Sequence, residues 1–242
     1  METSNQMVTL IEAMGDTIVE KNCYEFEGKK VPRVTKILSR CIHSDGLMYW
    51  ANSLGFKHQS YRKTVDAAAN IGTQCHNGID SFLEDNTFKF GAENVVEAQM
   101  AYNSFLKWFN DITSNAQVEV ILHEHTLICK YFGGTLDGLY RVNGKIYLVD
   151  YKTSNHITFN YCLQVAAYRY MLRNIMGIEI DGCIILQLSK TDISYNECVL
   201  NFSNPYDLQY INDCEIAFLS LVFSYYNLSK VEEGFKKLDW EV

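Results

Sequence analysis

The chain has 242 residues, 48% of them hydrophobic and 13% aromatic, with a formal net charge of −8. This composition excludes a disordered chain, and the sequence holds no apolar run long enough for a membrane-spanning helix. The acidic balance argues against tight, non-specific binding to duplex nucleic acid, because phosphate contacts need Lys and Arg, although a local basic patch is compatible with it.

Residues 1–16 contain neither Lys nor Arg, so we expect no secretory or mitochondrial address and a cytoplasmic protein. Eight cysteines are spread from Cys23 to Cys214 without a CxxC pair. Such spacing is typical of free thiols in a reducing compartment and offers no cluster of ligands for zinc or iron–sulfur groups.

The patterns predict a single domain, 1–242, without linkers or internal repeats. Along the chain we expect a small hairpin at 22–31 and short helices within 34–54, then amphipathic helices at 65–83 and 95–109. Strands are predicted at 117–129, 135–142, 145–152, 182–188 and 197–202, and further helices at 159–176 and 206–226. This order predicts a mixed α/β or α+β fold: a helical region at about 31–115, a sheet with a crossover helix at about 116–205, and a C-terminal helix at about 206–242.

Two acidic residues lie within apolar strands on either side of a predicted tight turn. Asn143-Gly144 between two alternating apolar runs is the strongest short-range signal for a two-residue hairpin. If the turn is that pair alone, counting outward places Asp137 opposite Asp150. Facing Cβ atoms lie about 4.5–5.5 Å apart, so two carboxylates there repel each other unless a cation lies between them. We therefore favour a divalent-cation site over a structural role for the two acids.

Lys152 lies two positions after Asp150, so the two side chains point to the same face of the strand. Lys152 is either an edge lysine with an apolar stem or a group that orients water and steadies charge on a phosphate. Its place beside two carboxylates favours the catalytic role.

Strand 117–129 carries a third candidate acid. Alternation would place Val118, Val120, Leu122 and Glu124 on one face, so that Glu124 ends an apolar face near the acidic pair. His123 and His125 would lie on the polar face, where solvated histidines explain the pattern better than a zinc site.

Three more residues have both a structural and a functional interpretation. His76 lies near the apolar stripe of its helix, and the residues alone favour a satisfied core histidine. Gln164 and Tyr168 lie one helical turn apart and share a face. They form either a packing pair with one hydrogen bond or a pair that flanks the acidic cluster.

These residues follow one another in a specific order. That order is His76, Glu124, Gly134-Thr135-Leu136-Asp137, Asp150-Tyr151-Lys152-Thr153 and Gln164-Val165-Ala166-Ala167-Tyr168. It resembles the PD-(D/E)XK nuclease superfamily, above all the RecB-like branch of phage-type recombination nucleases and mitochondrial genome-maintenance exonucleases. Residues 31–38 and Trp50-Ala51 also resemble the opening of those proteins, so the resemblance covers about residues 31–190.

The resemblance implies a central mixed sheet flanked by helices, with the active site at a strand hairpin. It implies that Mg²⁺ or Mn²⁺, as one or two ions, is bound by Asp137, Asp150, the carbonyl of Tyr151 and His76, with Glu124 as a second-metal or water-mediated ligand. Lys152 would orient the attacking water, and Gln164, Tyr168 and Thr153 would position the DNA. Some relatives hold an iron–sulfur cluster with late cysteines. This chain lacks that group of cysteines, so we expect no such cluster.

The function expected from these features is a metal-dependent DNA exonuclease of phage-type recombination, repair or degradation, in the host cytoplasm if phage-encoded. The alternatives are a structure-specific endonuclease or resolvase and an inactive nucleic-acid-binding subunit. DNA that is single-stranded or has free ends would be the substrate, and recombination or replication proteins the partners, with no membrane. Around Tyr61, Arg62 and Lys63 make a basic and aromatic segment suited to single strands, although a solvated helix start explains it equally well.

Overall fold

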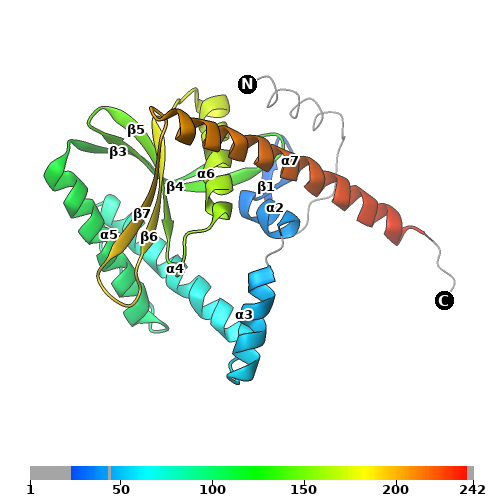
Figure 1. Ribbon diagram of the computed structural model, residues 1–242, viewed down its shortest axis with the longest axis horizontal. Coiled ribbons are helices and arrows are strands. Elements are labelled where there is room, and N and C mark those ends of the chain that lie inside the picture. Colours follow the sequence, from blue (N-terminus) through cyan, green and yellow to red (C-terminus); the bar gives the residue numbers. More distant parts are fainter. Residues whose placement is uncertain (1–22, 43–44, 239–242) are drawn as a thin grey trace.

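The computed structural model describes residues 23–42 and 45–238. A five-stranded sheet of order β3-β4-β5-β6-β7 lies at its centre, with helices against both faces (Figure 1). Neighbouring strands are antiparallel except β5 and β6, which are parallel. The strands are β3 Val118–Ile128, β4 Gly133–Val142, β5 Lys145–Lys152, β6 Gly182–Leu188 and β7 Tyr195–Asn201. The predicted mixed α+β architecture, with its antiparallel start, is confirmed.

The helices lie close to the predicted ranges. The parallel strands β5 and β6 are joined through α6 and a π-helical turn, as the crossover prediction required. The C-terminal helix continues to Lys236, beyond the predicted end at 226. The helices are α2 Val34–Cys41, α3 Asp45–Phe56, α4 Tyr61–Leu83, α5 Val95–Asn115, α6 Phe159–Met171, the π-helix η1 Leu172–Met176 and α7 Pro205–Lys236.

A second, two-stranded sheet precedes the helices. Strands β1 Cys23–Phe26 and β2 Lys29–Pro32 pair antiparallel, and the turn between them places Gly28 at φ +78°. A side chain strains a backbone in that left-handed region, which explains why glycine occupies the turn. A bridge from Arg33 to Gly133 joins this hairpin to the first residue of β4.

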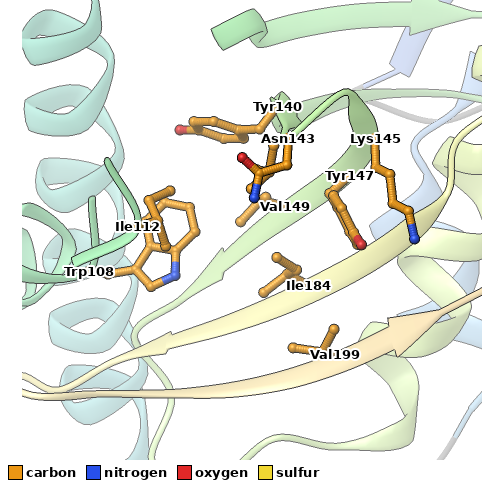
Figure 2. A pocket seen from close by; sticks show the side chains of 10 residues that line it. Trp108, Ile112, Tyr140, Asn143, Lys145, Tyr147, Val149, Ile184 and Val199 are labelled. Atoms are coloured by element: carbon orange, nitrogen blue, oxygen red, sulfur yellow. The ribbon is translucent and has the colours of Figure 1, made fainter. Parts of the chain in front are cut away.

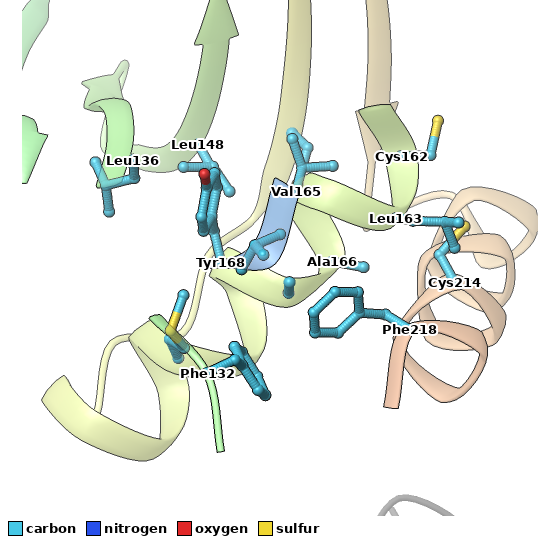
Figure 3. Close-up of a cluster of buried hydrophobic side chains, with 14 of the residues drawn as sticks. Phe132, Leu136, Leu148, Cys162, Leu163, Val165, Ala166, Tyr168, Cys214 and Phe218 are labelled. Atoms are coloured by element: carbon cyan, nitrogen blue, oxygen red, sulfur yellow. The ribbon is translucent and has the colours of Figure 1, made fainter. Parts of the chain in front are cut away.

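Each face of the central sheet has its own hydrophobic cluster. On one face, α6 lies between the sheet and α7, and Leu148, Val165 and Phe218 pack together (Figure 3). On the other face, α4 and α5 cover the sheet, and Trp108 and Tyr140 lie in contact there. Burying each such large apolar side chain contributes about 1.5–3 kcal/mol relative to exposure. The sheet is therefore held rigidly from both sides, and the ends of its strands are fixed in space.

All eight cysteines have free thiols, four of them buried and four partly buried. The prediction of free thiols is confirmed. Within the ranges 23–42 and 45–238, no helix is long and apolar enough to cross a bilayer.

Candidate active site

Three chemically active side chains meet where α4 lies against β3 and β4. His76 Nδ1 of α4 lies 3.2 Å from Glu124 Oε1 and 3.4 Å from Asp137 Oδ1. One ligand atom from each residue lies within 4.8 Å of the other two. Oxygen ligands bind Mg²⁺ at about 2.0–2.1 Å, so ligands of one ion are separated by at most about 4 Å. A small rearrangement would therefore bring all three groups onto one divalent cation.

Glu124 reaches this site through an irregular strand. The prediction that it shares a face with Val118, Val120 and Leu122 is wrong for Leu122 alone, because the pairing of β3 with β4 shifts between Val120 and Leu122. After the shift Leu122 packs in the cluster beneath α6, whereas Val118 and Val120 pack beneath α5. Glu124 itself has φ +41°, a left-handed conformation that is uncommon outside glycine. The bulge and this kink direct its carboxylate toward α4.

Asp137 and Asp150 lie one step beyond the last pair of the β4–β5 ladder. The ladder between β4 and β5 follows the predicted register from the turn as far as Gly138 and Val149, where it ends. Beyond that point Asp137 Oδ2 accepts a hydrogen bond of 2.7 Å from the backbone N–H of Tyr151. The predicted register therefore holds up to the last pair before the two acids, and the Asp137 charge acts on Asp150 by raising its pKa. Their direct facing stays a prediction.

Asp150 forms an ion pair with Lys152 on one face of β5, as predicted from their spacing. Asp150 Oδ2 lies 2.6 Å from Lys152 Nζ, and the Asp150 side chain is only 1% exposed. The ammonium also lies over the ring of Tyr161 on α6, 5.0 Å from its centroid. Asp150 Oδ1 is buried and has no hydrogen-bond partner among the described residues. A buried carboxylate oxygen without a partner is costly, which fits an oxygen that serves as a metal ligand.

The electrostatics of the site follow from burial and close charges. Burial, opposed by Lys152 and reinforced by Asp137, raises the pKa of Asp150 to about 6. Burial works against the protonated form of His76, but the carboxylates of Asp137 and Glu124 outweigh it and raise the His76 pKa to about 10. Without a cation, His76 therefore carries a proton at neutral pH, and a metal ion that binds its Nδ1 must displace that proton.

Opposing effects also act on the pKa values of Asp137 and Lys152. Burial alone would raise the pKa of Asp137, but His76, Lys152 and the Tyr151 N–H bring it below its usual value. Burial alone would lower the pKa of Lys152, but Asp150 and Asp137 bring it above its usual value. Lys152 is therefore a charged ammonium at neutral pH, able to donate hydrogen bonds but not to accept a proton.

Gln164 and Tyr168 border the acidic residues from α6. Gln164 Nε2 donates a hydrogen bond of 3.0 Å to Tyr168 Oη, and both side chains are buried. Burial, together with the charges of Asp137 and Asp150, raises the pKa of Tyr168 well above its usual value. The Tyr168 ring lies so close to β4 that a Cβ at Gly134 would be 2.5 Å from its Cε1. Gly134, three residues before Asp137, is thus needed for the close packing of α6 against β4.

The site opens to a cavity of about 260 Å³, which we call the catalytic cavity. Sequence reasoning missed four of its residues, which are Ala68, Ser154, Tyr161 and Lys190. Lys190 follows β6, which runs parallel beside β5, so its position near the end of β5 could have been inferred from the crossover topology. The lining is Ala68, His76, Tyr151, Lys152, Thr153, Ser154, Tyr161 and Lys190.

Two predicted DNA-contacting residues lie apart from this site. Arg62 and Lys63 are exposed in the first turn of α4. His76 follows Arg62 by fourteen positions, which corresponds to about 20 Å along a helix. Their role in DNA binding stays a prediction.

The expectation of a solvated His123 is wrong. His123 Nδ1 lies 2.6 Å from Asp80 Oδ1 of α4, and only about a quarter of its side chain is exposed. Glu84, one turn further along α4, is close enough to complete a second group of possible ligands. Because Asp80 and His123 contact each other directly, we interpret this group as a structural link between α4 and β3.

A second concave region lies at the turn end of the β4–β5 hairpin and is distinct from the site. This apolar cavity of about 370 Å³ is bordered by Trp108, Tyr140, Asn143 and Lys145 among others (Figure 2). Its lining contains neither a carboxylate nor an imidazole. Acid–base or metal chemistry therefore belongs to the opposite end of the hairpin.

Comparisons with known proteins give no family. No protein-family model matches the chain, and no curated protein matches it. Among solved structures, one described as "Crystal structure of SSO0001" is 12% identical, with 88% of this chain and 85% of that chain covered and a TM-score of 0.29. A likeness at that score carries no argument about fold family or function.

Proposed function

We propose that this chain is a metal-dependent DNA exonuclease with a PD-(D/E)XK-type core. One observation carries the proposal: the buried Asp150 has an unpartnered Oδ1, and its ion-pair partner Lys152 lines an open cavity beside His76. A metal-dependent phosphodiesterase needs oxygen ligands that bind a hard metal ion. It also benefits from a positively charged side chain that stays protonated while the reaction proceeds. Asp150 and Lys152 supply these two features next to each other.

The residues fit Mg²⁺ or Mn²⁺. The carboxylates of Asp137 and Asp150 would hold the ion, with His76 and Glu124 as further ligands on the α4 side. Such an ion, when bound, supplies an acidified water and neutralises charge on the phosphate. Carboxylate oxygens are the ligands that both ions prefer, and the imidazole of His76 favours Mn²⁺ more than Mg²⁺.

Lys152 has the position of a group that holds water or a phosphate oxygen. Its Nζ is fixed by Asp150 at 2.6 Å and by the ring of Tyr161, so few orientations of the ammonium remain. Because Lys152 lines the catalytic cavity, its free N–H groups can reach a substrate there. A fixed positive charge aimed at developing negative charge stabilises a transition state without reorganisation.

The preference for DNA ends rests on the sequence resemblance and on the net charge of −8, which disfavours tight binding along a duplex. The same resemblance suggests a place in phage-type recombination or repair inside the cell, alongside recombination or replication proteins.

The test compares end-labelled linear single strands, linear duplexes and covalently closed circles, each with Mg²⁺, with Mn²⁺ and with EDTA. We expect metal-dependent release of short products from linear DNA while circles stay intact, and no release by Asp150→Asn. Cut circles would replace the proposal with an endonuclease or resolvase. Binding without cleavage in every metal would replace it with a binding subunit.

A further inference from the structure

A polar cavity adjoins the catalytic cavity at the ends of β5 and β6. It measures about 390 Å³ and shares Thr153, Ser154 and Lys190 with the catalytic cavity, so the two are continuous. Pockets that bind small ligands measure about 300–1,000 Å³, which includes this size. The lining is Thr153, Ser154, Asn155, Gln187, Leu188, Ser189, Lys190, Thr191, Ser194 and Asn196.

The lining has a distinct chemistry. In a chain with net charge −8, this cavity is lined by hydroxyls, amides and one ammonium, and by no carboxylate. The side chains of Thr153, Asn155 and Lys190 make no hydrogen bond or ion pair with the described part of the chain. Lys190 is nevertheless partly buried. A partly buried ammonium and free donors at an open cavity suit an anionic ligand that is rich in oxygen.

The walls of this cavity are fixed before any ligand arrives. The loop between β6 and β7 is fastened to α5 through the fully buried Ser104. Its Oγ lies 3.1 Å from the carbonyls of both Ser189 and Asp192, either of which can accept its proton, and it accepts from the N–H of Ser194. Asp192 lies on the same loop, but its carboxylate accepts hydrogen bonds from the hydroxyls of Ser189 and Ser194. The acid is therefore engaged inside the loop.

The floor of the cavity is likewise tied together across three segments. Gln187 Nε2 of β6 donates 2.8 Å to the carbonyl of Ser154, which follows β5. Asn196 Nδ2 of β7 donates 3.1 Å to Gln187 Oε1. Because these walls are already ordered, little conformational entropy is lost when a ligand binds.

We propose that this polar cavity is the subsite for the nucleotide next to the scissile phosphodiester, with Lys190 on a backbone phosphate and Asn155 and Thr153 on sugar or phosphate oxygens. The inference rests on the proposed function and deepens it, because it assigns the direction in which the DNA strand leaves the catalytic cavity. Phosphate and sugar contacts of this kind position a strand without reading its sequence. The subsite should therefore act on every DNA strand and matter less for a phosphodiester that carries no flanking nucleotide.

The experiment compares Lys190→Ala with Lys145→Ala, which removes the same charge at the exposed turn of the hairpin. Lys145 and Lys152 are seven positions apart on β5, which is about 23 Å along a strand. Binding of a fluorescein-labelled single-stranded 20-mer is measured in EDTA at several salt concentrations. Hydrolysis is measured with the same 20-mer and with bis(p-nitrophenyl) phosphate in Mn²⁺.

For Lys190→Ala we expect about a tenfold rise in the Kd and KM of the 20-mer, typical for a lost charge-assisted hydrogen bond. The salt slope should fall by about 0.7 for the lost phosphate contact on a single strand. Hydrolysis of bis(p-nitrophenyl) phosphate should fall less than kcat/KM for the 20-mer, because this substrate carries no flanking nucleotide. Lys190→Arg should restore most of the affinity, and Asn155→Ala should show a smaller loss of the same kind.

Two outcomes separate the subsite from the proposed function. If the wild type cleaves DNA but Lys190→Ala equals Lys145→Ala in Kd, KM and salt slope, the subsite is refuted while the nuclease stands. If the wild type cleaves nothing yet Lys190→Ala alone loses affinity for the 20-mer, the polar cavity stands as a DNA-binding site and the nuclease is refuted. Equal melting temperatures of the variants exclude a general loss of folding.

Discussion

Removing the ammonium of Lys152 should make the stability of the metal-free protein depend on pH. Asp150 is 1% exposed, and with Lys152 2.6 Å away its pKa is already raised to about 6. Lys152→Met removes the nearest opposing charge, so the pKa of Asp150 rises further. Each further unit of Asp150 pKa lowers the free energy of unfolding by about 1.4 kcal/mol once the pH exceeds the new pKa. An acid whose pKa is higher in the folded than in the unfolded protein destabilises the fold when it is charged. The loss of stability in Lys152→Met is therefore small at pH 5 and grows toward pH 8.

The size of the loss follows from the burial of the pair. Breaking a buried ion pair by deleting one partner costs about 3–5 kcal/mol. Asp150 can escape part of this cost by taking up a proton, so we expect the full loss only at pH 8 and about half of it or less at pH 5. Urea unfolding in EDTA at the two pH values measures the difference.

A double variant provides the control. Asp150→Asn with Lys152→Met removes both charges, and replacing both members of a buried pair is often close to neutral. Its stability should lie within about 1 kcal/mol of the wild type at pH 8 and change little with pH beyond what the wild type shows. A Lys152→Met protein that is equally stable at pH 5 and pH 8 would refute the reasoning, because Asp150 would then feel no uncompensated burial.

Three further predictions test other parts of the site. Mn²⁺ at one hundred times its Kd should stabilise the wild type by about 2.7 kcal/mol, and the same concentration should stabilise Asp137→Asn much less. Equal rises in the melting temperatures of the two proteins would place the ion elsewhere. Gly134→Ala puts a Cβ 2.5 Å from Tyr168 Cε1, so it should lower the free energy of unfolding by about 1–3 kcal/mol; an unchanged urea midpoint would show that α6 moves freely. Replacing Arg62 and Lys63 by Ala should weaken single-strand binding and lower the salt slope by about 0.7 per lost phosphate contact, with Mn²⁺ affinity unchanged; an unaltered slope would place the DNA path away from the start of α4.

Local rules in the sequence were enough to determine the elements and one half of the candidate site. A two-residue turn at Asn143-Gly144 sets the register of the β4–β5 hairpin, and the ladder follows it from Val142 and Lys145 outward. The period of two along a strand was likewise enough to place Asp150 and Lys152 on one face, where they form an ion pair. These features depend only on neighbours along the chain and on the geometry of paired strands.

The other half of the site was decided by tertiary structure. His76 and Glu124 are 48 positions apart in sequence, and only the packing of α4 against β3 brings them to 3.2 Å. The shift between Val120 and Leu122 and the kink at Glu124 break the alternation that sequence reasoning must assume. Lys190 reaches the cavity because β6 lies parallel to β5 after a crossover through α6. A sequence encodes local periodicity directly, but bulges and contacts between distant segments depend on the energy of the whole packed core. Here that packing brought His76, Glu124 and Asp137 together from a helix and two strands.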